Sequence, residues 1–411
     1  MTGTRPDGLT AYVAVTAAYW AFMLTDGALR MLVLLHFHEL GFSPITLAWL
    51  FLLYELAGIV TNLSAGWLAA RFGLTSTLYA GLSLQIVALL ALSRLDPTWA
   101  MALSVPFVMV VQGLSGVAKD LAKMSSKSAV KLLAPQADGG LFRWVAVLTG
   151  SKNAVKGFGF FLGAALLGLI GFKVSVIAMA VILTVILVAV VLLMPSGLPR
   201  GSKAAKFAHV FATEPRVNRL SLARMFLFGA RDTWFVVGIP IYFHQVLSDG
   251  TPEGARLAFF LVGGFMAVWI IAYGAVQAAA PRLLRARSRS VEEITRLAIV
   301  WVGGLTVIPA ALALAALFPG AWLTPVLAVG LLVFGFVFAV NSSIHSYLIL
   351  AFTGAERVTM DVGFYYMSNA AGRLIGTLLS GISYQLGGLA LCLGTAALMA
   401  GASYLAARRL A

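Results

Sequence analysis

About twelve apolar segments, separated by short polar breaks, are each long enough to cross a bilayer. A chain that is 61% apolar and only 11% charged has too few polar residues to cover these segments with a water-soluble surface. The sequence therefore predicts an all-α, multi-pass membrane protein with 12 transmembrane helices. The expected spans are 9-35, 45-70, 74-93, 98-120, 143-170, 172-194, 219-247, 256-281, 294-317, 321-350, 358-386 and 388-407.

A hydrophilic stretch separates the first six expected spans from the last six. We expect an N-terminal six-helix half at 1-194, a cytoplasmic linker at 195-218 and a C-terminal six-helix half at 219-411. Of the 29 lysines and arginines, 19 fall in segments on the side of the N-terminus and 3 on the opposite side. Because basic loops stay in the cytoplasm, this bias predicts that both termini are cytoplasmic.

Two lysines lie inside an apolar span, in the stretch WVAVLTGSKNAVKGFGFFLG. If that helix enters the bilayer at Arg143, Lys152 lies about 13 Å deep and Lys156 about 20 Å deep. A charge at such depth costs about 2.5 to 3.5 kcal/mol, and residues four apart share a helix face. We therefore expect both lysines to face a water-filled cavity that binds an anion.

Other basic and polar side chains are expected at similar depth, and we include them as candidate substrate-binding residues. With Lys152 and Lys156, the set comprises Lys119, Lys123, Arg30, Arg231, Arg373, Asn153, Asn341, His345, Asn369, Tyr273 and Gln277. Tyr273 and Gln277 are four apart on one span and could bind a ligand or form helix–helix contacts.

The second half of the chain partly repeats the first. The tetrapeptide SKNA at 151–154 corresponds to MSNA at 367–370. Matching Gly113 with Gly335 likewise aligns polar residues of the fourth and tenth spans. Parallel repeats of this kind place a binding site between the two halves of many transporters.

Four acidic residues also fall within or near the spans, and we include them as gating or proton-coupling candidates. They are Asp26, Glu55, Asp120 and Asp232. Asp26 and Arg30 are four residues apart, so they can either pair along one helix face or act in substrate binding or gating. Asp232 should point about 100° away from Arg231, so we do not expect it to neutralise that arginine fully.

No grouping of residues typical of an enzyme is present: the sequence lacks HExxH, GxSxG and GxxxxGK[ST]. The single cysteine, Cys392, excludes an internal disulfide and a thiolate metal cluster, and we expect no cofactor or metal. The net charge of +14 is distributed by loop and not along one soluble face, so nucleic acid is not an expected partner. Because deep basic residues outnumber deep acids, the cavity favours oxyanions such as phosphate or arsenate esters.

The segment GWLAARFG at 66–73 resembles the loop after the second span of the major facilitator superfamily. Ala70 stands where that family usually has an acid, and Leu74 and Thr75 stand where it has basic residues. The flanking glycines, Gly66 and Gly73, would allow the tight turn that the loop requires.

Over essentially its whole length the chain resembles the ArsJ family of organoarsenical efflux permeases, a branch of that superfamily. The longest matching segments are YWAFMLTDGALRMLVLLHFHELGFSP, GLSGVAKDLAKMSSKSAVKLL, WVAVLTGSKNAVKGFGFFLG and FLFGARDTWFVV. The resemblance implies export of 1-arseno-3-phosphoglycerate from the cytoplasm through the bacterial inner membrane. It also implies a functional partnership with glyceraldehyde-3-phosphate dehydrogenase, which forms this ester from arsenate, without a required stable complex.

Two alternatives stay open. An exchanger of organophosphates and phosphate would use the same cationic cavity. A receptor built on a transporter fold would sense a substrate without a transport cycle.

Overall fold

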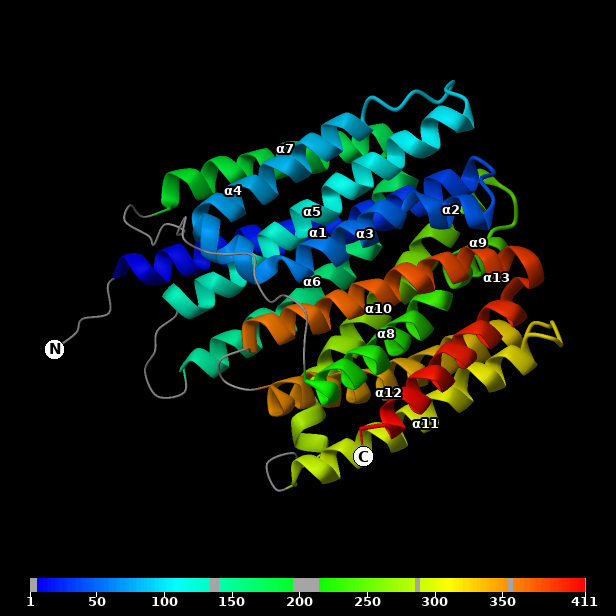
Figure 1. Ribbon diagram of the computed structural model, residues 1–411. Helices are drawn as coiled ribbons and strands as arrows, with labels where there is room; N and C mark the ends of the chain where they lie inside the picture. The colour runs from blue at the N-terminus through cyan, green and yellow to red at the C-terminus, as the bar shows by residue number, and fades with distance from the viewer. Residues whose placement is uncertain (1–5, 134–139, 195–213, 285–288, 354–357, 411) are drawn as a thin grey trace.

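The computed structural model describes residues 6–133, 140–194, 214–284, 289–353 and 358–410. Within these ranges the chain is helical nearly throughout and contains no strand (Figure 1). The helices are α1 (Pro6–Glu39), α2 (Pro44–Leu50), α3 (Leu52–Leu63), α4 (Ala65–Leu92), α5 (Met101–Leu133), α6 (Gly140–Ile170), α7 (Phe172–Leu193), α8 (Pro215–Phe235), α9 (Gly238–Leu247), α10 (Pro252–Leu283), α11 (Val291–Ala315), α12 (Leu323–Phe352) and α13 (Val358–Arg408). The predicted all-α class is confirmed.

Ten stretches of the described helices are long and apolar enough to cross a membrane. The last of them, in α13, is broken by non-helical backbone at Gly387 and Gly388 and therefore supplies two crossings. Gly388 has φ 59°, a conformation that favours glycine. Helices α8 and α9 together form the seventh span, and the charged side chains of α8 lower its hydropathy. With these two additions the helices correspond to the twelve expected spans.

Two predicted boundaries shift in the structure. The second span ends with α3 at Leu63, and the break before the third span lies at Gly73, which has φ 75°. The predicted span 45-70 is therefore too long, because its last residues already belong to the first turns of α4.

The linker 195-218 lies mostly outside the described residues, and α8 begins at Pro215. The division of the chain at this linker stays a prediction.

Matched glycines occupy matching contacts in the two halves. A Cβ on Gly113 of α5 would lie 3.2 Å from Leu53 Cβ of α3. A Cβ on Gly335 of α12 would lie 2.8 Å from Trp269 Nε1 of α10. Helix α5, the fourth span, thus packs against α3 of the second span. Helix α12, the tenth span, packs against α10, the eighth span, in the same way. This agreement supports the parallel repeat inferred from the sequence.

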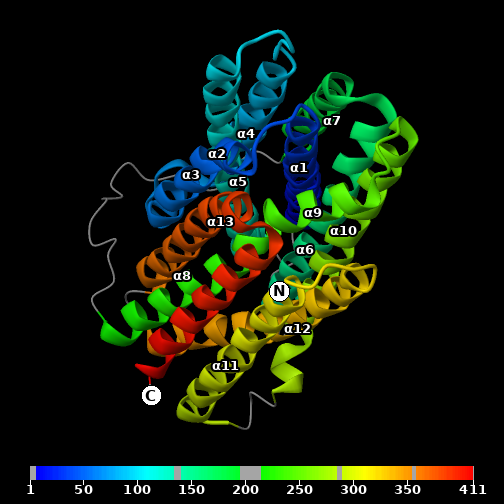
Figure 2. The same ribbon diagram turned by 90° about the vertical axis from the view of Figure 1, so that its right-hand side faces the viewer.

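The two halves meet along two pairs of helices, α3 with α13 and α6 with α10 (Figure 2). Gly58 of α3 lies beside Ala370 of α13, and Gly274 of α10 lies beside Asn153 of α6. At the end where α1 turns into α2, Gly381 of α13 fits closely against α2, because a Cβ there would lie 2.6 Å from Pro44 O. These contacts place polar residues of both halves next to one another.

Candidate functional site

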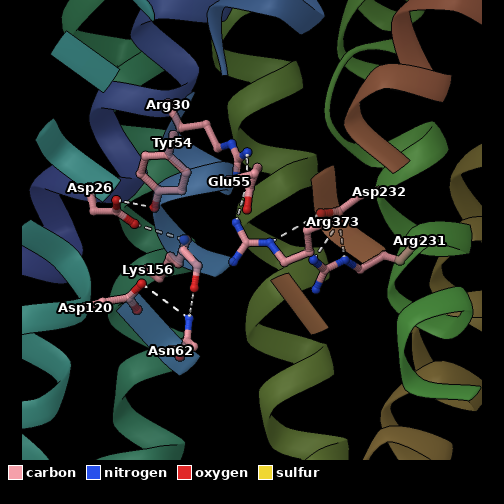
Figure 3. A network of polar contacts seen from close by, with 11 residues as sticks. Asp26, Arg30, Tyr54, Glu55, Asn62, Asp120, Lys156, Arg231, Asp232 and Arg373 are labelled. Atoms are coloured by element: carbon pink, nitrogen blue, oxygen red, sulfur yellow. Dashed lines mark hydrogen bonds and ion pairs between the residues drawn. The ribbon is translucent and has the colours of Figure 1, made fainter. Parts of the chain in front are cut away.

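A buried carboxylate joins arginines from both halves of the molecule (Figure 3). Glu55 of α3 is fully buried. Its Oε1 lies 2.7 Å from Arg30 Nη2 of α1 and 2.6 Å from Arg373 Nη2 of α13. Glu55 therefore links its own half to the C-terminal half through one ion-paired oxygen.

The chain of ion pairs continues into α8. Arg373 Nε lies 3.4 Å from Asp232 Oδ2, and Arg231 Nε donates to Asp232 Oδ1 at 2.6 Å. Arg231 Nη2 also lies 2.5 Å from Asp232 Oδ1. The expectation that Asp232 would neutralise Arg231 only in part did not foresee this ion pair, which forms because the long arginine side chain folds back to its neighbour; Asp232 nevertheless shares its charge with Arg373.

A second buried carboxylate lies on α1. Asp26 Oδ2 contacts Lys156 Nζ of α6 at 2.9 Å, and Asp26 Oδ1 accepts a hydrogen bond from the Tyr54 hydroxyl at 2.6 Å. The predicted pair of Asp26 with Arg30 does not form, because Arg30 bonds Glu55 instead. The mid-membrane lysine is therefore held by a carboxylate of a neighbouring span.

Glycines bring α6 close enough to α1 for this ion pair. A Cβ on Gly27 would lie 2.6 Å from the backbone oxygen of Lys156. A Cβ on Gly159 would collide with the backbone of Leu24, and one on Gly163 with that of Ala28. Small residues at these positions allow the two backbones to touch, as expected for helices that pack in a membrane.

A third carboxylate, Asp120 of α5, is enclosed by donors. Thr61 Oγ1 donates to Asp120 Oδ2 at 2.5 Å, and Asn62 Nδ2 donates to the same oxygen at 3.3 Å. Lys123 Nζ lies 3.3 Å from Asp120 Oδ1 and donates to Asn62 Oδ1 at 2.6 Å. Both carboxylate oxygens of Asp120 are thus satisfied from α3 and α5.

Lys119 differs from the other central lysines. It is 7% exposed, and its ammonium lies 4.0 Å from the centroid of the Tyr54 ring. Across the described parts of the chain, Lys119 has no carboxylate within ion-pair distance. The fourth predicted lysine, Lys152, is partly buried on α6.

Polar side chains of α6, α10 and α12 form a bridge between the halves. Asn153 Nδ2 donates to Gln277 Oε1 at 3.2 Å, and Gln277 Nε2 donates to Ser342 Oγ at 3.4 Å. The Tyr273 hydroxyl lies 3.5 Å from the same Ser342 oxygen. Of the two roles left open for Tyr273 and Gln277, the structure shows the helix–helix contact.

Arg224 of α8 is held next to this bridge. Its Nη1 donates to the backbone oxygen and to Oγ of Ser342, both at 3.0 Å, and its Nε donates to Asn369 Oδ1 at 3.3 Å. The Arg224 guanidinium carbon lies 4.1 Å from the Phe228 ring centroid, and that of Arg231 lies 4.8 Å from it. Both arginines of α8 therefore approach the same aromatic ring.

Asn341 and His345 of α12 are fully buried. In the part of the chain that the structure describes, neither amide atom of Asn341 and neither ring nitrogen of His345 has a hydrogen-bond partner. Buried polar groups in folded proteins are nearly always hydrogen-bonded. These two side chains therefore mark a polar position that another molecule could occupy.

The structure thus places the predicted residues other than Lys152 in two adjoining groups, and Arg224 joins the second of them. The central group holds Asp26, Arg30, Glu55, Lys119, Asp120, Lys123, Lys156, Arg231, Asp232 and Arg373, and the second holds Asn153, Arg224, Tyr273, Gln277, Asn341, His345 and Asn369. Sequence reasoning missed Tyr54, Thr61 and Asn62 as partners of these residues. Their signal was weak: each is a neutral polar residue, and Thr61 and Asn62 bond a carboxylate that lies on another helix.

The arrangement leaves an excess of buried positive charge. Each of the four carboxylates contacts a basic side chain. Lys119 and Arg224 contact none of the described acids, and both are more than nine-tenths buried. The described residues hold no cluster of metal-ligating side chains. A site with unbalanced cations and several donors suits an oxyanion.

The sequence matches the Major Facilitator Superfamily over residues 14–377. The chain belongs to this superfamily. Its fold is accordingly that of an all-α membrane protein with twelve spans in two six-helix halves. Membership of this superfamily indicates a transporter and not an enzyme.

Solved structures with the same fold include a peptide transporter POT in complex with sulfate, with TM-score 0.72 and 15% identity over 100% of this chain and 94% of that one. A POT family transporter in complex with 5-aminolevulinic acid has TM-score 0.69 and 14% identity, covering 97% of this chain and 96% of that one. At such identities the likeness shows the fold alone. No curated protein matches the sequence.

The first prediction concerns the arginines of the ion-pair chain. Arg373 contacts two carboxylates through different nitrogens, and Arg231 contacts one through two nitrogens. A lysine supplies one point charge and cannot make both contacts. We expect Arg373→Lys and Arg231→Lys each to lower the transport rate about tenfold or more, whereas Arg408→Lys, at the exposed end of α13, should not.

Transport in membrane vesicles, normalised to the amount of protein, is the measurement. Full activity in both arginine variants would mean that these side chains act only as counter-charges.

Proposed function

We propose that this transporter exports a small, multiply charged organic anion from the cytoplasm and so confers arsenate resistance. The proposed substrate is 1-arseno-3-phosphoglycerate, and the proposed location is the bacterial inner membrane with both termini in the cytoplasm. The observation that carries the proposal is the excess of buried cations. Lys119 and Arg224 lack a carboxylate among the described residues, while every central acid is already paired.

Buried charge of one sign is costly in a bilayer unless a counter-charge reaches it. A phosphate or arsenate ester supplies several oxygens that accept hydrogen bonds. Guanidinium groups bind such oxygens in pairs, and ammonium groups add point charge. The same pocket would repel a lipophilic cation.

Glu55 gives this site a way to couple binding to movement. Its carboxylate holds Arg30 of its own half and Arg373 of the other half through one oxygen. An incoming oxyanion competes with Glu55 for both guanidinium groups. Once Arg373 exchanges Glu55 for the substrate, the link between α3 and α13 is released and the halves can rock around the bound anion, as alternating access requires.

The specific substrate is supported by the segments that resemble the ArsJ family. The four quoted segments contribute Asp26 and Arg30, Lys119 to Lys123, Lys152 to Lys156, and Arg231 with Asp232. The family-like stretches and the buried charges of the site are therefore largely the same residues. Glyceraldehyde-3-phosphate dehydrogenase would supply the ester in the cytoplasm, and no contact between the two proteins is needed.

Transport into everted membrane vesicles tests this function. We expect arsenate uptake without ATP, and only when the dehydrogenase and its substrates are present. Vesicles with heat-inactivated dehydrogenase are the matched control. Equal uptake of plain 3-phosphoglycerate would favour an organophosphate exchanger, the alternative that the same cavity allows. Specific binding without any uptake would favour a substrate-sensing receptor.

A further inference from the structure

The buried polar position on α12 lies beside an arginine that has no described carboxylate partner. Asn341 and His345 are four residues apart, so they follow one face of the helix. Ser342, between them in sequence, accepts two hydrogen bonds from Arg224 Nη1. The guanidinium group therefore lies against the same helical turn as the two unsatisfied side chains.

This position offers both charge and hydrogen bonding. Arg224 is 4% exposed, and its described contacts are neutral oxygens and aromatic rings. Asn341 offers an amide donor and acceptor, and His345 offers two ring nitrogens, all without described partners. An anionic or oxygen-rich group placed here would satisfy the amide and imidazole and balance the guanidinium charge.

A line of tyrosines connects this position with the lysines of the N-terminal half. Arg224 Cζ lies 4.9 Å from the Tyr365 ring centroid, and the Tyr365 and Tyr366 centroids are 5.5 Å apart. Lys123 Nζ lies 5.1 Å from the Tyr366 centroid, and Lys119 lies one helical turn before Lys123. The two buried cations without described carboxylates therefore occupy the two sides of one polar region, one in each half.

We infer that Arg224, with Asn341 and His345, binds the second polar end of a two-ended anionic substrate whose first end lies at Lys119. This inference rests on the proposed function and assigns the residues of the C-terminal half that would hold the second end of its two-ended anion. A single anionic group at Lys119 leaves Arg224 without a counter-charge, because Tyr365 and Tyr366 lie between the two cations. A bis-anion contacts both halves, so its binding also draws them together.

Two ligands of equal carbon length test the inference: propane-1,3-diyl bisphosphate and propyl phosphate. Their affinities for the full-length protein in detergent can be measured by calorimetry. We expect the wild-type protein to bind the bisphosphate about tenfold or more tightly than the monophosphate, because charged hydrogen bonds form at the second end. Arg224→Gln should reduce this ratio to about two or less, while Arg216→Gln, on the exposed first turn of α8, should leave it unchanged.

The variant Asn341→Leu distinguishes a loss of ligand binding from a loss of protein stability. Its side chain has no described hydrogen-bond partner to lose, so the thermal stability should be kept or raised. The preference for the bisphosphate should nevertheless fall. An equal affinity of the wild-type protein for both ligands, or an unchanged ratio in Arg224→Gln, would overturn the inference while anion transport stands. Failure to bind either phosphate ester would instead contradict the proposed function.

Discussion

Glu55→Gln is expected to lower transport about a hundredfold or more, because the amide cannot neutralise the two arginines that contact Glu55. Arg30 and Arg373 approach Oε1 of this carboxylate within 2.7 and 2.6 Å, and Glu55 is fully buried. Breaking a buried ion pair by removing one partner costs about 3 to 5 kcal/mol. The link between α3 and α13 is lost together with the charge balance. Vesicle uptake per molecule of inserted protein measures the effect.

Glu253→Gln is the matched control for this change. Glu253 is exposed in the first turn of α10, so its loss should leave both insertion and uptake unchanged. Uptake by Glu55→Gln within a factor of about two of the wild type would contradict a role for the shared carboxylate. A variant that inserts normally but stays inactive would support that role.

Lys156→Ala is expected to abolish arsenate resistance while the protein is still inserted and expressed. Lys156 lies near the middle of α6, and its ammonium is 2.9 Å from Asp26 Oδ2. The substitution removes a candidate substrate-binding cation and leaves Asp26, which is 3% exposed, with only the Tyr54 hydroxyl as a described partner. Lys152→Ala should also abolish resistance, whereas Lys173→Ala, at an exposed position near the start of α7, should not.

A paired substitution shows whether Lys156 does more than neutralise Asp26. Asp26→Asn with Lys156→Gln removes both charges and should restore the stability lost in Lys156→Ala. If the lysine also binds the substrate, uptake stays low in this double variant. Recovery of wild-type uptake would show that Lys156 is only a structural counter-charge, as would wild-type resistance in well-expressed Lys156→Ala.

The sequence predicted most of the fold because the bilayer constrains it strongly. Apolar runs of about 20 residues mark the spans directly. Gly73 and the pair Gly387 and Gly388 mark breaks where a side chain is disfavoured. The predicted end of the second span was misplaced. The chain passes from α3, which ends at Leu63, directly into α4, which begins at Ala65, and local composition does not reveal the break between the two helices.

The site was predicted less completely than the fold. Depth along a helix follows from the 1.5 Å rise per residue, and the candidates chosen in this way are mostly buried or partly buried in the structure. Partners depend on how helices pack, and this explains why Asp26 bonds Lys156 of α6 and not Arg30 four residues away. Side-chain length also matters, since Arg231 folds back to its neighbour Asp232.

An imposed membrane potential provides the most direct test of the proposal that this transporter exports an anion. Everted vesicles with an imposed inside-positive potential and no pH gradient should accumulate arsenate rapidly when the dehydrogenase system is present. An ester with about three negative charges gains about 7 kcal/mol per 100 mV in this direction, so no proton is needed. The account would be contradicted if the potential had no effect, or if a pH gradient alone at zero potential drove accumulation against the substrate gradient.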